Sequence, residues 1–151
     1  MNKSVDGFEF QTLLEGTVGQ GLELVITVSG NSMSPLFIDR KTKVLLKPAD
    51  TIKIGEVYLF INNASKMVLH RLVKMNKDQN LLYFRGDHNI LVDEPVAIHQ
   101  VKAKVEGYYQ QESFIKMNSF RQTSYLLMHD VLFILRSILF KFISGFRRLF
   151  R

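Results

Sequence analysis

The sequence predicts one mainly β domain with a short helix before it and an amphipathic helix after it. Its 151 residues suit a single domain, and an apolar content of 46% is enough to form a buried core. Between residues 22 and 109 the hydrophobic side chains recur mostly at every second position, which is the period of a β-strand.

The first predicted element is a short helix around Glu9–Glu15. Leu13 and Leu14 supply apolar side chains within this segment, and Gly16 or Gly19 is expected to end the helix. The acids of this region leave no continuous apolar run, so the sequence shows no secretory signal and no N-terminal membrane anchor.

Six strand-like runs follow, with turn-forming residues between them. In the first run Leu22, Leu24 and Ile26 alternate with other side chains up to Ser29. The other five runs are Lys43–Lys47, Glu56–Ile61, Met67–Lys74, Leu81–Arg85 and Val101–Tyr109. Six short strands at this spacing favour a compact, mainly β domain within residues 1–119.

The positive charge is concentrated at the C-terminal end. Six basic side chains and one acid lie in residues 120–151, so this segment carries five of the net six positive charges, and residues 1–119 carry one. Such a domain is not expected to bind nucleic acid. The absence of cysteine excludes disulfides, thiolate metal sites and a cysteine nucleophile.

Residues 125–150 predict an amphipathic helix. On a helical wheel the basic and polar side chains of this segment fall mostly in an arc of about 140°, and apolar side chains fill the remainder. The favoured interpretation is a helix that lies in a membrane interface. A helix that spans the membrane and a helix that packs on protein are the two alternatives.

Three segments carry the residues that matter for chemistry. They are Ser29–Leu36, which contains Ser32-Met33 and Pro35; Leu69–Val73, which contains His70-Arg71; and Phe84–Asn89, which is followed by Asp93. Each segment alone is typical of an ordinary turn or strand. In this order, and with Gly55-Glu56-Val57 between the first two, they resemble the signal-peptidase family of serine endopeptidases.

The resemblance covers residues 24–107 and implies a compact, coiled β-sheet catalytic domain of the signal-peptidase type. It assigns Ser32 as the nucleophile and His70 as the base, as in the family members that use histidine. Asp93 is the first candidate for the acid that completes a triad, and Asp87 is the second. No metal or other cofactor is implied.

The chemistry suits these residue types. A serine hydroxyl is a weak nucleophile that needs an adjacent base, and histidine accepts a proton near neutral pH. A carboxylate fixes the tautomer of that histidine, while main-chain N–H groups stabilise the oxyanion. Gly30, Asn31 and Met33 are expected to form the oxyanion and substrate-binding region, with Gly30 allowing close approach and Met33 packing beneath the site. The resemblance also implies a substrate that adds as a strand, for which Leu24–Ser29 is the expected edge.

Two positions differ from the family pattern. Gly30 stands where a hydroxyl residue can supply an oxyanion donor, and Ile38-Asp39 replaces the usual Gly-Asp. Without an N-terminal anchor, the expected enzyme is membrane-associated through residues 125–150 and works on the cytoplasmic face. Its expected partners are a precursor peptide or protein whose leader or signal segment it cleaves, and an exporter or maturation complex.

Three rival hypotheses remain open. The first is a non-catalytic peptide-binding module of the same fold, tethered to the membrane by its C-terminal helix. The second assigns the function to the basic tail itself, acting on membranes. The third is a metal site formed by His88, His99 and Asp93.

Overall fold

The computed structural model describes residues 7–118 and residue 131. Its first element is α1 (Gly7–Thr17), which continues into a 3₁₀ turn, η1 (Val18–Gln20). Among the described residues no helix is both long and apolar enough to cross a membrane. The predicted helix at 125–150 and most of the tail at 120–151 lie outside the described residues.

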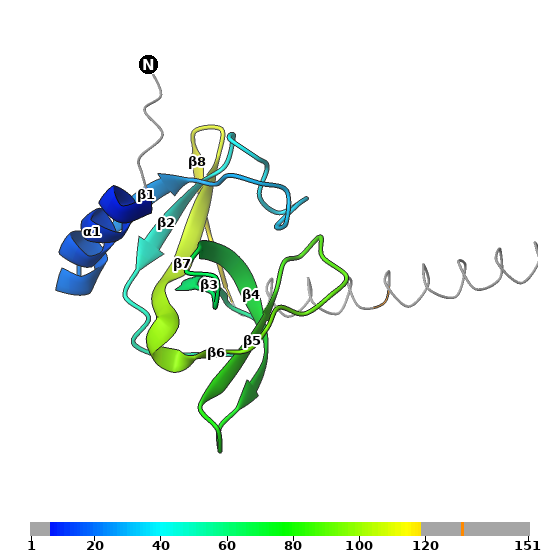
Figure 1. The fold of residues 1–151 in the computed structure, drawn as a ribbon. Coiled ribbons are helices and arrows are strands. Elements are labelled where there is room, and N and C mark those ends of the chain that lie inside the picture. The colour runs from blue at the N-terminus through cyan, green and yellow to red at the C-terminus, as the bar shows by residue number, and fades with distance from the viewer. Residues whose placement is uncertain (1–6, 119–130, 132–151) are drawn as a thin grey trace, which may run out of the picture.

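The remaining elements form one antiparallel sheet that curls into a half-barrel (Figure 1). The order of its strands is β1-β2-β7-β3-β4-β5-β6, and β8 pairs with β7 off this path. The strands are β1 (Leu24–Thr27), β2 (Lys43–Lys47), β3 (Val57–Ile61), β4 (Met67–Asn76), β5 (Leu81–Arg85), β6 (Val96–Ala97), β7 (Val101–Gln110) and β8 (Ser113–Lys116), with a 3₁₀ turn η2 (Ile98–Gln100) before β7.

The mainly β class and the short N-terminal helix are confirmed, but the helix ends differently from the prediction. Neither Gly16 nor Gly19 closes it. Val18 is buried in the core and extends the turn, and Gly21 then closes it with a φ of 84° and an N–H bond to the Val18 carbonyl. All six predicted strands are present, and β6 and β8 are additional strands that the alternation did not indicate.

The alternation of the strands divides the interior into two cores. In β3, Val57 and Leu59 belong to one core, and Tyr58 and Phe60 belong to the other. The first core also receives α1 and the chain after β1, and its buried members are Leu14, Val18, Val28, Met33, Phe37, Val44, Leu46, Val57, Leu59, Ala103 and Val105. The second contains Tyr58, Phe60, Leu72, Leu82, Phe84 and Val96. The sheet therefore has a packed core on each face, and the side chains of β4 point alternately toward one core and the other.

Candidate functional site

Ser32 lies in a tight turn after β1. The N–H of Ser34 donates to the Asn31 carbonyl at 3.0 Å, and the N–H of Phe37 donates to the Met33 carbonyl at 2.9 Å. Met33 and Phe37 are 1% and 0% exposed, so their side chains fix the turn to the first core. Ser32 itself is half-buried. The predicted packing role of Met33 beneath the turn agrees with this arrangement.

Gly30 enters this turn in a conformation that disfavours side chains. Its φ is 96°, in the region that glycine adopts at no steric cost. The Asp39 carboxylate accepts a 2.7 Å hydrogen bond from the Gly30 N–H. Asp39 therefore closes the turn from its far side, a role that the sequence did not suggest for the Ile38-Asp39 pair.

β4 carries two consecutive charged or polar side chains between β3 and β5. In register, His70 stands opposite Tyr58, and Arg71 stands opposite Val57 and Arg85. Because consecutive side chains of a strand point to opposite faces, His70 and Arg71 face different cores. The His70 ring lies beside Phe60, with 6.4 Å between ring centroids, as expected for a histidine on the apolar face.

The imidazole of His70 is bound by Asp93. Nδ1 of His70 and Oδ2 of Asp93 are 2.6 Å apart, and the two side chains are 8% and 28% exposed. An ionised carboxylate can only accept a hydrogen bond, so Nδ1 is the donor of this pair. In the neutral imidazole, Nε2 is then the nitrogen without a proton. Among the described residues nothing forms a hydrogen bond with Nε2.

Asp87, the other candidate acid, is bound by Arg71 instead. Nε of Arg71 donates to Oδ1 at 2.7 Å and Nη2 donates to Oδ2 at 2.6 Å, a bidentate pair. Nη1 donates to the Gly55 carbonyl at 2.7 Å. The two side chains are 0% and 4% exposed. Both oxygens of Asp87 are therefore occupied, and the geometry pairs Asp93, not Asp87, with His70.

The chain after β5 connects the Ser32 turn to these pairs. The N–H of His88 donates to the Ser32 carbonyl at 2.8 Å. A Cβ on Gly86 would lie 2.6 Å from the same carbonyl oxygen, so only glycine allows this approach. Residues 86–88 thus touch the backbone of Ser32 while the Asp87 side chain binds Arg71. The three predicted segments do meet in space.

The side chains of Ser32 and His70 do not make a hydrogen bond in this structure. Within residues 7–118 the Ser32 hydroxyl has no hydrogen-bond partner at all. The metal alternative finds no support in the same residues, because no three His, Asp or Glu side chains gather there as ligands. His88 and His99 are exposed, and Asp93 is engaged with His70.

A second polar cluster surrounds the hydroxyl of Tyr58 in β3. The sequence did not predict it. The Tyr58 hydroxyl donates to Glu56 at 2.6 Å and accepts from the Lys53 N–H at 2.8 Å. Burial raises the pKa of the Tyr58 phenol, and the hydrogen bond to Glu56 raises it further. The signal available in the sequence was Gly55-Glu56-Val57, which the family resemblance marked without giving it this role. In the structure it supports β4 from the β3 side.

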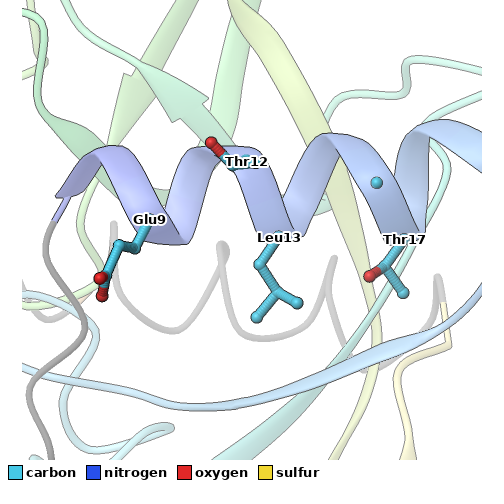
Figure 2. A pocket seen from close by; sticks show the side chains of 5 residues that line it. Glu9, Thr12, Leu13 and Thr17 are labelled. Atoms are coloured by element: carbon cyan, nitrogen blue, oxygen red, sulfur yellow. The ribbon is translucent and has the colours of Figure 1, made fainter.

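Hollows elsewhere on the surface do not coincide with these residues. One of about 520 Å³ runs along α1 and is lined by Glu9, Thr12, Leu13, Gly16 and Thr17. Figure 2 shows Glu9, Leu13 and Thr17 projecting to the same side of this helix. The residues that line this hollow include one acid, Glu9, and no histidine or lysine. The site is therefore identified from paired side chains rather than from concavity.

Comparison with known proteins adds no assignment: no protein-family model matches the chain, and no curated protein matches it.

Proposed function

We propose that this protein is a serine endopeptidase of the signal-peptidase type, with Ser32 as nucleophile, His70 as general base and Asp93 as the orienting acid. The observation that carries the proposal is the 2.6 Å contact between His70 Nδ1 and Asp93. It supplies the tautomer that a base toward serine needs, with Nε2 unprotonated. The loop that carries Asp93 also contacts the Ser32 backbone, because the His88 N–H donates to the Ser32 carbonyl.

The reaction follows from these groups. The Ser32 oxygen attacks the carbonyl carbon of a peptide bond while its proton passes to Nε2 of His70. The tetrahedral intermediate collapses, the C–N bond breaks, and His70 returns the proton to the leaving amine. Water, deprotonated by the same nitrogen, then hydrolyses the acyl-enzyme and regenerates the serine. The Asp93 carboxylate stabilises the imidazolium in both steps.

Main-chain N–H groups of the turn are suited to hold the oxyanion. Those of Ser34 and Phe37 are used within the turn. Those of Ser32 and Met33 have no acceptor among residues 7–118, and in our proposal they bind the oxyanion. This arrangement needs no hydroxyl at position 30, where the chain has glycine. Asn31 precedes the proposed nucleophile and is exposed, and in our proposal it contacts substrate.

The proposed substrate is a precursor peptide or protein from which a leader or signal segment is cleaved. β1 lies at one end of the sheet, so its outer edge is open among the described residues to an added strand. In the proposal the tail at 125–150 holds the enzyme on the cytoplasmic face of a membrane, close to an exporter or maturation complex. The substrate class and this placement rest on the resemblance and on the charge pattern of the tail.

One observation favours a second candidate, the non-catalytic peptide-binding module. The hydrogen bond between Ser32 and His70 that an active serine peptidase uses is absent from the described residues. Such contacts often tighten only when substrate binds. The two hypotheses differ in turnover, which is directly measurable.

The test is cleavage of a complex peptide mixture by the full chain in mild detergent, with new termini identified by mass spectrometry. The parent protein should generate a recurrent set of cleavage sites. Ser32→Ala should abolish that set, and Ser34→Ala, a change of the same size in the same turn, should leave it intact. Peptides retained equally by parent and Ser32→Ala without any cleavage would support the binding module and refute the enzyme.

A further inference from the structure

The segment between β1 and β2 is closed at its base by hydrogen bonds. The N–H of Val28 donates to the Thr42 carbonyl at 2.9 Å, and the N–H of Arg40 donates to the Val28 carbonyl at 2.9 Å. The hydroxyl of Thr42, which is buried, accepts from the Ile38 N–H at 2.8 Å. The base of the segment is therefore fixed beside β2, and Asp39 belongs to this base.

Asp39 reaches from this base to the chain that enters the Ser32 turn. Its Oδ1 accepts the N–H of Gly30 at 2.7 Å, a hydrogen bond to a carboxylate. A Cβ at Gly30 would meet no atom within 4 Å, so glycine is needed here for its φ of 96° and not for space. Since glycine adopts many backbone conformations at similar cost, the bond to Asp39 favours the one that is observed.

The two proposed oxyanion donors, the N–H groups of Ser32 and Met33, lie in peptide planes that other groups hold. The Met33 N–H shares its planar peptide group with the Ser32 carbonyl, which the His88 N–H binds at 2.8 Å. The Ser32 N–H shares its peptide group with the Asn31 carbonyl, which the Ser34 N–H binds at 3.0 Å. This second bond stays within the turn, so it fixes the shape of the turn but not its direction relative to β1.

The bond between Gly30 and Asp39 supplies the direction that the internal bond cannot. It lies between β1 and the proposed nucleophile, two residues before Ser32. We propose that Asp39 is a positioning residue for the reaction at Ser32, because its bond to Gly30 aims the N–H groups of the turn at the oxyanion. The inference rests on the proposed function. Asp39 touches no reacting atom, and its effect comes from the hydrogen bond rather than from its negative charge.

The Asp39 carboxylate can be altered without opening the core. Its side chain is 36% exposed, and its other oxygen, Oδ2, lies 3.9 Å from Nε of Arg40. Met33 and Phe37, which fix the turn to the first core, are held by packing. Loss of the bond to Gly30 should therefore change the direction of the turn more than the stability of the fold. Asparagine keeps an oxygen that can accept the same bond, whereas alanine removes it.

The test measures the rate at which a fluorophosphonate modifies Ser32 in the full chain, in mild detergent, over a range of reagent concentrations. The variants are Asp39→Ala, Asp39→Asn and, as a matched control, Asp50→Ala, which removes an exposed acid from the bend after β2. Rates are read from the mass of the intact protein and are expressed per folded molecule, as determined by urea unfolding. In parallel, the amide proton of Gly30 is followed by NMR in protein labelled with ¹⁵N-glycine.

Asp39→Ala should lower the maximal rate constant by roughly 10- to 100-fold, the equivalent of one lost charge-assisted hydrogen bond, with little change in the half-saturating reagent concentration. Asp39→Asn should stay within about threefold of the parent rate, and Asp50→Ala should match it. The Gly30 amide proton should lie downfield in the parent. It should move upfield in Asp39→Ala and far less in Asp39→Asn, which reports the bond without reference to activity.

A parent that reacts at Ser32 and an Asp39→Ala variant that reacts as fast would overturn the inference and leave the proposed function standing. Equal losses in Asp39→Asn and Asp39→Ala would do the same, because charge and not the hydrogen bond would then matter. So would a loss seen only in the half-saturating concentration, or a Gly30 signal that is identical in all three proteins. A parent that is not modified at Ser32 refutes the proposed function, and the inference with it.

Discussion

His70 and Arg71 are adjacent in β4, and each binds a carboxylate of the same loop, yet the two pairs are built differently. The Arg71–Asp87 pair is sealed, with exposures of 0% and 4% and with both carboxylate oxygens used. The His70–Asp93 pair uses one contact, and its carboxylate is 28% exposed. A sealed, fully used ion pair is suited to fixing a structure. A pair that leaves a basic nitrogen open is suited to moving a proton.

The loop between β5 and β6 supplies the carboxylate of both pairs, the one suited to fixing the structure and the one suited to moving a proton. Asp87 ties the segment 86–88 to β4, and the same segment binds the Ser32 carbonyl through His88. Asp93 returns to β4 seven positions after Gly86 on the other face of the strand. In our interpretation the arginine pair sets the distance between turn and strand, and the histidine pair carries out chemistry within that frame.

The largest expected effect separates the two acids by reaction rate. Asp93→Asn should lower the rate constant for modification by a serine-directed phosphonate by about 10⁴-fold, because an amide can donate to Nδ1 and stabilise the wrong tautomer. Asp87→Asn should lower the rate per folded molecule far less, because the amide oxygen can still accept one of the two hydrogen bonds from Arg71 and hold the turn to β4. The rates are read from the mass of the intact protein over time. Equal losses in both variants would contradict the division of roles.

The next effect compares Arg71 and His70 by what each contributes to the free energy of unfolding. Arg71→Leu should lower the free energy of unfolding by about 3–5 kcal/mol, because it leaves the Asp87 carboxylate buried and unpaired. His70→Leu should cost about 1 kcal/mol, since Asp93 can turn to water. Urea unfolding followed by circular dichroism measures both. A larger loss from His70→Leu than from Arg71→Leu would overturn the comparison.

A double replacement tests whether the Arg71–Asp87 pair positions the site in addition to stabilising the fold. Arg71→Met combined with Asp87→Leu removes both buried charges, and it should recover at least about 2 kcal/mol of the stability lost in Arg71→Leu. The restored protein should still react more slowly at Ser32, because the turn is no longer held to β4 by this pair. Full recovery of both stability and rate would show that the ion pair does not position the site.

The smallest expected effect concerns Tyr58, which stands opposite His70 in β3. Its raised pKa means that the folded protein keeps the phenol protonated, so this contribution to stability is complete below the ordinary tyrosine pKa of about 10 and is lost as pH rises above it. Tyr58→Phe should cost about 1 kcal/mol at pH 7. Above pH 10 the parent should lose stability more steeply than the variant in urea titrations. Parallel curves would contradict the assignment.

The strands were predictable because alternation is a local signal. The runs Lys43–Lys47 and Leu81–Arg85 match β2 and β5 residue for residue. β8 is largely exposed and forms by pairing with the end of β7, so its own sequence did not indicate it. The two residues of β6 are too short to show a period. The sequence did not indicate the 3₁₀ turn η1, which continues the helical path from Thr17 past Gly19 because Val18 is buried, a tertiary effect.

The site was predictable as a set of residues but not as a set of contacts. Spacing alone left Asp87 and Asp93 as alternatives, because a loop can bring either carboxylate to His70. The choice depends on Arg71, which takes both oxygens of Asp87. The role of Asp39 in closing the Gly30 turn was hidden for the same reason. Contacts between distant segments are decided by the fold, and no local pattern encodes them.

The central claim is that Ser32 is a nucleophile activated by His70. The most direct measurement is covalent labelling of the full chain by a fluorophosphonate between pH 5 and pH 9, with the modified residue located by mass spectrometry. The account predicts labelling at Ser32 that is lost in His70→Ala and survives in Ser34→Ala. Labelling of Ser32 at the same rate in His70→Ala, or labelling confined to other hydroxyl groups, would contradict it.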